Sequence, residues 1–257
     1  MCAVCGNVYC PPNCPEYDAR KDPSYTGDCE LCGTPLYRDD IRYCEGCRET
    51  LEAMEKEDKD IISFDAEKHE YIVNGEVVPC VSDIIAVYGK EIEEGDDLEN
   101  TMEAAAERGT VCHKVLEMLL SGREPEYPSA YEMYVDAIRL FLSEHTILPL
   151  AIETPIYSEK YGYAGTPDLL CYFDGVLSLL DYKFVAQILK TKVKAQLNAY
   201  CKAYEEQDVY PDQLLAIQFL KDGTYRVYPV KYDDEEIEVA VKLWNLKQKK
   251  HPRGKIA

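Results

Sequence analysis

The hydrophobic pattern changes its period several times along residues 61–257, and each change predicts a strand or a helix. Strands are expected where apolar and polar residues alternate, or where short apolar runs lie between turn residues. These segments are residues 61–65, 70–73, 76–78, 151–158, 166–173, 176–184, 214–220 and 225–230. Helices are expected where apolar residues return every three or four positions, as they do in residues 101–120, 129–144, 190–206 and 234–249.

Shorter signals complete this pattern. Asn74-Gly75 and Asp174-Gly175 are typical hairpin turns. Ser82 is expected to cap a short helix that ends near Tyr88, and the acidic residues 91–100, which have no period, are expected to form an exposed loop. The order of helix, three strands, helix and strand predicts an α/β fold with a mixed central sheet flanked by helices.

The first 50 residues have a different composition, because they are rich in Cys, Pro and Gly and poor in apolar residues that could build a core. We therefore expect three parts: a cysteine-rich module in residues 1–50, a charged linker or helix in residues 51–60, and a main domain in residues 61–257. Eight of the 12 cysteines belong to the first part. The other four are scattered, and we expect them to be small buried apolar residues: Cys80, Cys112, Cys171 and Cys201.

Charge and the length of the apolar runs limit the classes of function and the compartment that the sequence allows. The chain carries 48 acidic and 28 basic residues, a net charge of −20, which does not indicate a nucleic-acid-binding surface by itself. Lysines gather in residues 183–202 and 247–255, so a local basic groove is compatible with the sequence. No apolar run approaches the roughly 20 residues that span a membrane, and the N-terminus lacks the basic and apolar regions of a signal peptide. We expect a cytoplasmic protein without a membrane partner.

In a reducing compartment, clustered cysteines are metal ligands more often than disulfides. Two C-x-x-C pairs, Cys29 with Cys32 and Cys44 with Cys47, are separated by a spacer that suits one tetrahedral Zn²⁺. A second set is more irregular and comprises Cys2, Cys5, Cys10 and Cys14. The sequence predicts one or two structural zinc sites, and an interleaved pairing of the two sets stays open.

Acidic residues and a lysine also recur within the predicted strands. Asp181 and Lys183 are two positions apart, so in a strand they project from the same face. A hairpin that turns at Asp174-Gly175 would bring Asp168 beside Asp181. Burying these charges among leucines is costly without a counter-ion. The spacing therefore predicts a site for Mg²⁺ or Mn²⁺, which prefer oxygen ligands.

These residues resemble the signature of the PD-(D/E)xK nuclease superfamily, in Pro167-Asp168 and Asp181-Tyr182-Lys183. The sequence from Gln196 to Tyr200 looks like the Q-x-x-x-Y motif of the RecB-type branch, and residues 108–117, which include His113, look like the helix of that branch that supplies a histidine ligand. Residues 69–84 look like the lead-in of phage-type members, although Cys80 stands where these have serine. The resemblance covers roughly residues 101–230.

The resemblance implies a restriction-endonuclease-like core and a role for each matching residue. The metal would be held by His113, Asp168, Asp181 and the carbonyl of Tyr182. Lys183 would act on the attacking water, and Gln196 and Tyr200 would position Lys183 or the DNA strand. Glu117 and Glu153 are further candidate ligands of the metal or its water.

The predicted activity is that of a metal-dependent deoxyribonuclease that binds DNA, with an exonuclease of a bacterium or of a phage-infected cell preferred. A structure-selective endonuclease would use the same residues. A non-enzymatic zinc-dependent adaptor on a nuclease-like fold is the second alternative. Some RecB-type nucleases hold an iron–sulfur cluster with three cysteines after the core, but this chain has only Cys201 beyond Lys183, so zinc is preferred. A homo-oligomer, or a protein partner bound through the cysteine module, also stays open.

Overall fold

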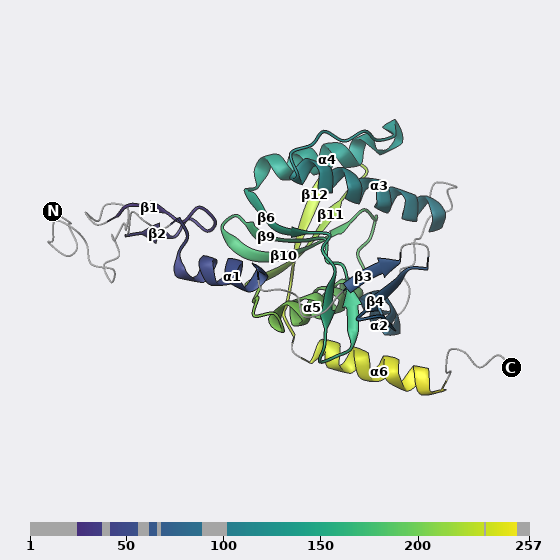
Figure 1. The fold of residues 1–257 in the computed structure, drawn as a ribbon. Coiled ribbons are helices and arrows are strands. Elements are labelled where there is room, and N and C mark those ends of the chain that lie inside the picture. The colour runs from purple at the N-terminus through teal and green to yellow at the C-terminus, as the bar shows by residue number, and fades with distance from the viewer. Residues whose placement is uncertain are drawn as a thin grey trace. The chain divides into compact units, whose positions relative to one another are not determined.

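The computed structural model describes residues 25–37, 42–55, 62–65, 68–88, 102–233 and 235–250. It divides the chain into two compact units, Met1–Lys56 and Glu57–Ala257 (Figure 1). The second predicted cysteine set, Cys2, Cys5, Cys10 and Cys14, and the loop expected at residues 91–100 lie outside the described residues. Among the described residues, no helix combines the length and the apolarity that crossing a membrane requires.

In the first unit, a short hairpin is followed by one helix. Strand β1 (Gly27–Asp28) pairs antiparallel with β2 (Pro35–Leu36), and helix α1 (Glu45–Glu55) follows. The helix continues beyond residue 50, where we expected the cysteine-rich module to end. Residues 51–55 of the expected linker are thus the end of α1, while residues 56–60 are outside the described part of the chain.

A five-stranded mixed sheet forms the centre of the second unit. Its strand order is β12 (Tyr225–Val230), β11 (Gln213–Phe219), β10 (Val176–Lys183), β9 (Leu169–Phe173) and β6 (Ile147–Ile152). Only β10 and β11 pair in parallel, since α5 (Lys190–Glu205) connects them as a crossover. The other pairs are antiparallel. The predicted α/β class with a mixed sheet is confirmed.

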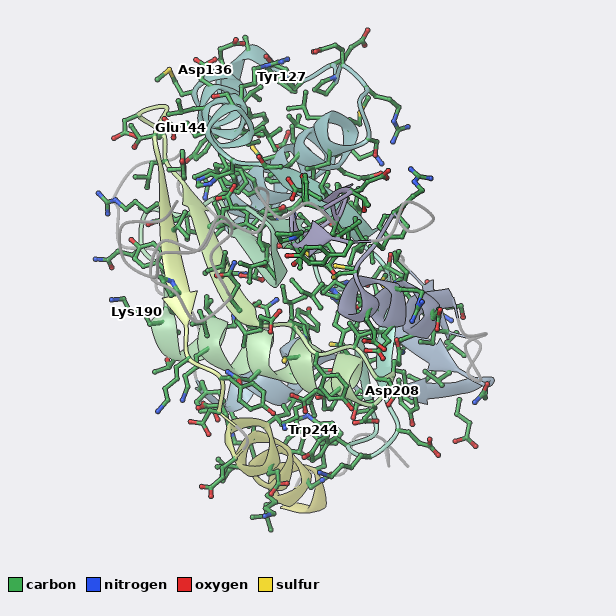
Figure 2. All side chains as sticks on the ribbon, turned by 90° about the vertical axis from the view of Figure 1, so that its left-hand side faces the viewer. Tyr127, Asp136, Glu144, Lys190, Asp208 and Trp244 are labelled. Carbon is green, nitrogen blue, oxygen red and sulfur yellow. The ribbon has the colours of Figure 1, made fainter. Side chains whose placement is uncertain are left out.

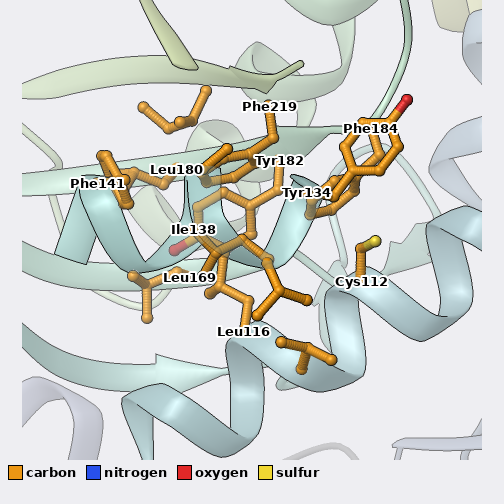
Figure 3. Packing of buried hydrophobic residues seen from close by; sticks show 14 of the residues in the cluster. Cys112, Leu116, Tyr134, Ile138, Phe141, Leu169, Leu180, Tyr182, Phe184 and Phe219 are labelled. Carbon is orange, nitrogen blue, oxygen red and sulfur yellow. The ribbon is translucent and has the colours of Figure 1, made fainter. Parts of the chain in front are cut away.

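Helices cover both faces of this sheet (Figure 1). On one face, α3 (Met102–Leu120) and α4 (Glu132–Glu144) pack against alternate side chains of β9, β10 and β11 and form a large buried cluster. Figure 3 shows its centre, where residues such as Leu116, Ile138 and Leu180 are almost fully buried. On the other face, α5 contacts β10, β11 and β12. Strand β10 is buried on both faces, which explains its nearly continuous apolar sequence.

The second unit also contains two small sheets and several short helices. Strands β3 (Ile62–Asp65), β4 (Glu70–Val73) and β5 (Glu76–Val78) form an antiparallel sheet, and β7 (Ile156–Ser158) pairs with β8 (Tyr163–Gly165). Helix α2 (Val81–Ile85), the short 3-10 helix η2 (Ala86–Tyr88) and the last helix, α6 (Glu236–Lys250), pack together. The short 3-10 helix η4 (Ser129–Tyr131) leads into α4. A backbone hydrogen bond from Ala164 to Pro79 joins β8 to the start of α2.

Two predictions about these elements are wrong. The strand expected at residues 151–158 is two strands, because Glu153 has a φ of +46° and interrupts the extended backbone between β6 and β7. Ser82 does not cap α2, since the cap residue is Cys80 and Ser82 lies inside the helix. There the hydroxyl of Ser82 contacts Cys80 Sγ at 2.9 Å.

Candidate active site

The two predicted aspartates meet at the end of the β9–β10 hairpin. The register pairs Leu169 with Leu180, so Asp168, one position before β9, stands opposite Asp181. The backbone N–H of Tyr182 donates to Asp168 Oδ2 at 2.5 Å. Opposite residues of an antiparallel pair lie on the same face. Both carboxyl groups are therefore buried at one end of the sheet, with 13% of the Asp168 side chain and 2% of the Asp181 side chain exposed.

Lys183 lies beside Asp181 on this face and bridges the sheet to α5. Its Nζ donates to Asp181 Oδ1 at 2.9 Å and to Gln196 Oε1 at 3.1 Å. Gln196 Nε2 in turn donates to the hydroxyl of Tyr200 at 3.4 Å, one helical turn further along α5. The structure thus brings together four of the predicted residues in one chain of contacts: Asp181, Lys183, Gln196 and Tyr200.

A second group of side chains adjoins Asp168, one from α3 and one from the residue directly after β6. His113 Nδ1 is 3.3 Å from Glu153 Oε1 and 3.5 Å from Asp168 Oδ1. One ligand atom from each of these three residues lies within 4.8 Å of the other two. Asp181 is not part of this group, because its carboxylate is turned toward Lys183. The structure therefore brings His113, Glu153 and Asp168 together most closely.

Glu153 reaches this group through an unusual backbone conformation. Its φ of +46° lies in the left-handed region, which residues with a Cβ rarely adopt. Its N–H donates to the carbonyl of Asp168 at 3.1 Å, so the end of β6 stays joined to the start of β9. Left-handed residues outside glycine are often associated with functional sites. The sequence pattern named Glu153 only as a further candidate, since nothing in it indicates this turn.

The electrostatics of the site are dominated by buried carboxylates. Burial raises the pKa of Asp181 to about 6, and Asp168 adds to the rise while Lys183 opposes it. Burial also raises the pKa of Asp168, against the attraction of His113 and Lys183. For His113, burial lowers the pKa, but the carboxylates of Asp168 and Glu153 outweigh it and the net pKa is raised. The protein alone leaves negative charge at the site incompletely balanced.

This donor set fits a hard divalent cation. Imidazole nitrogen and carboxylate oxygen are the ligands that Mg²⁺ and Mn²⁺ accept in proteins. Asp181 Oδ2 is buried and, among the described residues, accepts no hydrogen bond of normal geometry, although Lys183 Nζ lies 2.8 Å from it. The imidazole of His113 and the carboxylates of Glu153 and Asp168, with Asp181 beside them, are therefore a donor set that could hold such a cation.

The remaining predicted residues lie around this group or apart from it. Tyr182 points into the core on the opposite face, and only its backbone borders Asp168. Glu117 pairs with Lys114 at 2.7 Å and with Arg123 at 3.7 Å, and it does not join the ligand atoms of His113. The roles expected for Tyr182 and Glu117 stay predictions.

Two contacts near the site were not expected from the sequence pattern. The hydroxyl of Tyr71 in β4 is 2.7 Å from Thr166 Oγ1, two residues before Asp168. Arg108 Nε, in α3, donates to the carbonyl of Phe184 at 2.8 Å, immediately after Lys183. Both residues hold the loop ends that carry the acidic and basic groups. Their only signal in the sequence was their place in the stretches that resemble the RecB-type helix and the phage-type lead-in.

The first unit contains a separate candidate metal site. The sulfur atoms of Cys29, Cys32, Cys44 and Cys47 all lie within 4.8 Å of one another, and all four cysteines are free. Gly33, at a φ of +71°, closes the first knuckle with a hydrogen bond to the carbonyl of Cys29. The pKa of Cys29 is lowered to about 7, because backbone hydrogen bonds outweigh the effect of burial. This four-cysteine cluster is consistent with a zinc site.

Comparisons with known proteins returned matches only among solved structures. No family model and no curated protein matches the sequence. The fold is similar to LHK-Exo in complex with dAMP, at 13% identity and a TM-score of 0.37 over 67% of this chain and 88% of that chain. A second structure of this alkaline exonuclease from Laribacter hongkongensis, also 13% identical, matches with a TM-score of 0.35 over 66% of this chain and 85% of that one.

A phage-related exonuclease from Haemophilus somnus 129PT is also similar, at 13% identity and a TM-score of 0.32 over 67% of this chain and 95% of that chain. These identities and TM-scores are too low to transfer an activity. Any function therefore has to be inferred from the chemistry of the residues in the site.

Proposed function

We propose that the second unit is a divalent-metal-dependent nuclease that hydrolyses phosphodiester bonds of DNA. The observation that carries this proposal is the convergence at one sheet end of the ligand group His113, Glu153 and Asp168 with a lysine held by Asp181 and Gln196. A lysine beside a metal site supplies positive charge and a donor for phosphate oxygen. The order of these residues along the chain agrees with the resemblance to RecB-type nucleases.

In this proposal, His113 and Asp168 hold the cation together with one or both of Glu153 and Asp181. The cation, when bound, would lower the pKa of a water molecule and offset the charge on the phosphate. In the reaction an oxygen of water forms a bond to phosphorus, and the bond from phosphorus to the 3′ oxygen of the preceding sugar breaks. The water gives up one proton and the 3′ oxygen gains one, which leaves a 5′-phosphate and a 3′-hydroxyl.

The chain's own residues position this reaction. Lys183 is fixed between Asp181 and Gln196, so its ammonium group has a defined direction and can donate to a phosphate oxygen or to the attacking water. Tyr200 holds the amide of Gln196 in turn. Since Asp181 is buried and only 17% of the Lys183 side chain is exposed, bulk water is largely excluded from this side of the site.

The test is cleavage of end-labelled linear DNA and of closed circular DNA with added Mg²⁺ or Mn²⁺. We expect wild-type protein to degrade the linear DNA, and Lys183→Ala to lose at least about 100-fold in rate. The matched control is Lys242→Ala, which removes the same charge from a side chain that is 75% exposed on α6. Equal rates for wild type and Lys183→Ala would contradict the proposal.

Cleavage of the circular substrate as well would favour the endonuclease alternative. Absence of cleavage with either metal, together with retained DNA binding, would favour the non-enzymatic adaptor.

A further inference from the structure

A pocket of about 670 Å³ lies on the second unit, outside the candidate active site. It is bounded by residues 68–70 at the start of β4, by strand β5, by the start of α2 and by the C-terminal half of α6. Apolar groups line one part of it, including Val77, Pro79 and Trp244, and the polar groups include Lys68, His69 and Gln248. The volume lies in the range of small-molecule sites, and six of the eleven lining residues are polar or charged, which favours a polar ligand.

Trp244 gives the pocket a broad aromatic surface. Figure 2 labels its position on α6. It lies on the face of the helix that carries Ile237 and Ala240, which are fully buried, whereas Trp244 is only half-buried. The first turns of α6 therefore pack against the rest of the second unit, and the indole of Trp244, one turn later, lines the pocket. Trp244 is the only tryptophan of the chain. A partly exposed indole at a pocket wall is a suitable platform for stacking a flat ring.

The pocket lining also includes a lysine and a histidine directly before β4. Lys68 is 69% exposed and pairs loosely with Asp65 at 3.6 Å. His69 has a φ of +55°, and its ring meets the edge of Phe64 with centroids 5.2 Å apart. An ammonium and an imidazole beside an aromatic platform can meet a phosphate and the base attached to it.

Two carboxylates, Glu70 and Asp83, also line the pocket. Asp83 accepts a hydrogen bond from the N–H of Cys80 at 3.4 Å. Carboxylates in such a pocket oppose a highly charged ligand such as a free polyphosphate. Carboxylates accept hydrogen bonds from the N–H groups on the edges of nucleobases. They are therefore compatible with a nucleobase inside the pocket whose phosphate stays at the rim of the pocket.

Strand β4 connects the pocket with the candidate active site. Glu70 lines the pocket, whereas the hydroxyl of its neighbour Tyr71 contacts Thr166, two residues before Asp168. One strand that passes around the edge of the small sheet could reach both sites. We propose that this pocket binds an unpaired nucleobase of a DNA strand, stacked on Trp244 with its phosphate near Lys68 and His69. The choice of DNA as the ligand rests on the proposed nuclease function.

The experiment uses the fluorescence of the single tryptophan as a direct reporter of the pocket. Oligothymidylate is titrated into the full chain without added divalent cation, so that no cleavage occurs, and binding is measured in parallel by anisotropy of a labelled strand. We expect saturable quenching of Trp244 with the same Kd in both measurements. Trp244→Ala should weaken binding of the labelled strand about tenfold, and Trp244→Phe should weaken it less, because phenylalanine keeps part of the stacking surface.

Lys68→Ala should weaken binding several-fold and reduce its dependence on salt, because one phosphate contact is lost. The matched control is again Lys242→Ala, which lies on the same helix as Trp244 but does not line the pocket, and it should bind like wild type. A blunt, fully paired duplex should not quench the tryptophan.

Unchanged fluorescence, or equal binding by wild type, Trp244→Phe and Lys68→Ala, would overturn the pocket assignment. The melting temperature of each variant shows whether a loss of binding is due to misfolding. If the Trp244 variants misfold, the binding affinity of Lys68→Ala tests the pocket assignment. Quenching without any cleavage under Mg²⁺ or Mn²⁺ would refute the nuclease proposal while the pocket stands. Normal cleavage with unchanged tryptophan fluorescence would refute the pocket assignment and leave the nuclease proposal standing.

Discussion

At the scale of single residues, Glu153 combines a left-handed backbone with a place in the candidate metal site. Its carboxylate lies 3.3 Å from His113 Nδ1, and it takes part in the ligand group despite a left-handed backbone. A strained residue persists when its surroundings hold it in place, and here the hydrogen bond to the carbonyl of Asp168 does so. This conformation directs the side chain away from the sheet and toward α3.

We therefore expect Glu153→Gln to weaken binding of Mn²⁺ by about tenfold or more, since the amide keeps the size but loses the charge. Calorimetric titration of the metal measures this. Glu117→Gln is the matched control, because it removes the same charge from a carboxylate that is paired with Lys114 and Arg123. If both variants lost the same affinity, Glu153 would have no special place at the metal.

Asp181 should make the stability of the metal-free protein depend on pH. Its pKa is raised from 3.8 to about 6 in the folded protein, chiefly by burial. Between these values the folded state holds a proton that the unfolded state has lost. The free energy of unfolding should therefore fall as the pH rises from about 4 to about 6, by at most about 3 kcal/mol for this group. The raised pKa of His113 acts in the same direction at higher pH.

Urea unfolding at a series of pH values, without added divalent cation, measures this dependence. Asp181→Asn removes the titrating group and should flatten the curve between pH 4 and pH 6 relative to wild type. Parallel curves for the two proteins would show that the pKa of Asp181 is the same in the folded and unfolded states, which would contradict the raised pKa.

The sequence was sufficient to predict contacts between site residues that lie close together in one strand, one helix or one hairpin. Asp181 and Lys183 share a face because a strand has a period of two, and Gln196 and Tyr200 share one because they are one helical turn apart. The approach of Asp168 to Asp181 follows from a short hairpin. The contacts of Glu153 and Tyr71 could not be predicted, since one depends on a positive φ and the other on the docking of a separate small sheet.

At the scale of elements, β8 and α5 approach so closely at Gly165 that no side chain fits. A Cβ at this position would lie 2.7 Å from Tyr200 Cε1 and 2.9 Å from Val81 Cγ2. Gly165→Ala should therefore destabilise the protein by about 1–3 kcal/mol. It should also lower the rate of DNA cleavage, because a displaced Tyr200 no longer holds Gln196 and Lys183.

Thermal unfolding and the cleavage assay measure these two effects. The control is Gly109→Ala in α3, where a Cβ meets nothing within 4 Å. Alanine is a better helix former than glycine, so this variant should be unchanged or more stable by about 0.5–1 kcal/mol. An equally stable and active Gly165→Ala would mean that β8 and α5 can separate without cost.

The elements with strong periods were predicted well, and those defined by tertiary contacts were not. Helix α3, strand β10 and helix α5 have long, regular patterns, and their observed ends lie close to the expected ones. The break between β6 and β7 depends on the positive φ of Glu153, and the cap of α2 depends on contacts between Cys80 and Asp83; the hydrophobic pattern encodes neither.

At the scale of the whole molecule, the chain combines two units that are stabilised in different ways. The second unit has an extensive apolar core between its sheet and helices. In the described part of the first unit, few residues are buried, and two of them are Cys29 and Cys47 of the cysteine cluster. A hairpin of two-residue strands and one helix gain little from such a core, so we expect a metal to supply the missing stability.

We therefore expect Cys29→Ala to lose one bound zinc ion per chain, as measured by elemental analysis of the purified protein. Residues 25–55 should then become more sensitive to proteolysis, because the ligands no longer join the hairpin to α1. The melting transition of the second unit should stay unchanged, since its core includes none of these cysteines. Cys201→Ala, which removes a buried thiol from α5, is the control and should retain the zinc.

The result separates a structural metal from a catalytic one. If zinc only folds the first unit, Cys29→Ala should still cleave short linear DNA with added Mg²⁺ or Mn²⁺, because His113 and the carboxylates of the second unit are untouched. A loss of cleavage together with a normal melting transition would mean that the first unit takes part in binding the substrate. Unchanged zinc content in Cys29→Ala, or its loss in Cys201→Ala, would exclude the four-cysteine cluster as the site, since a tetrahedral zinc without one of its thiolates is bound far more weakly.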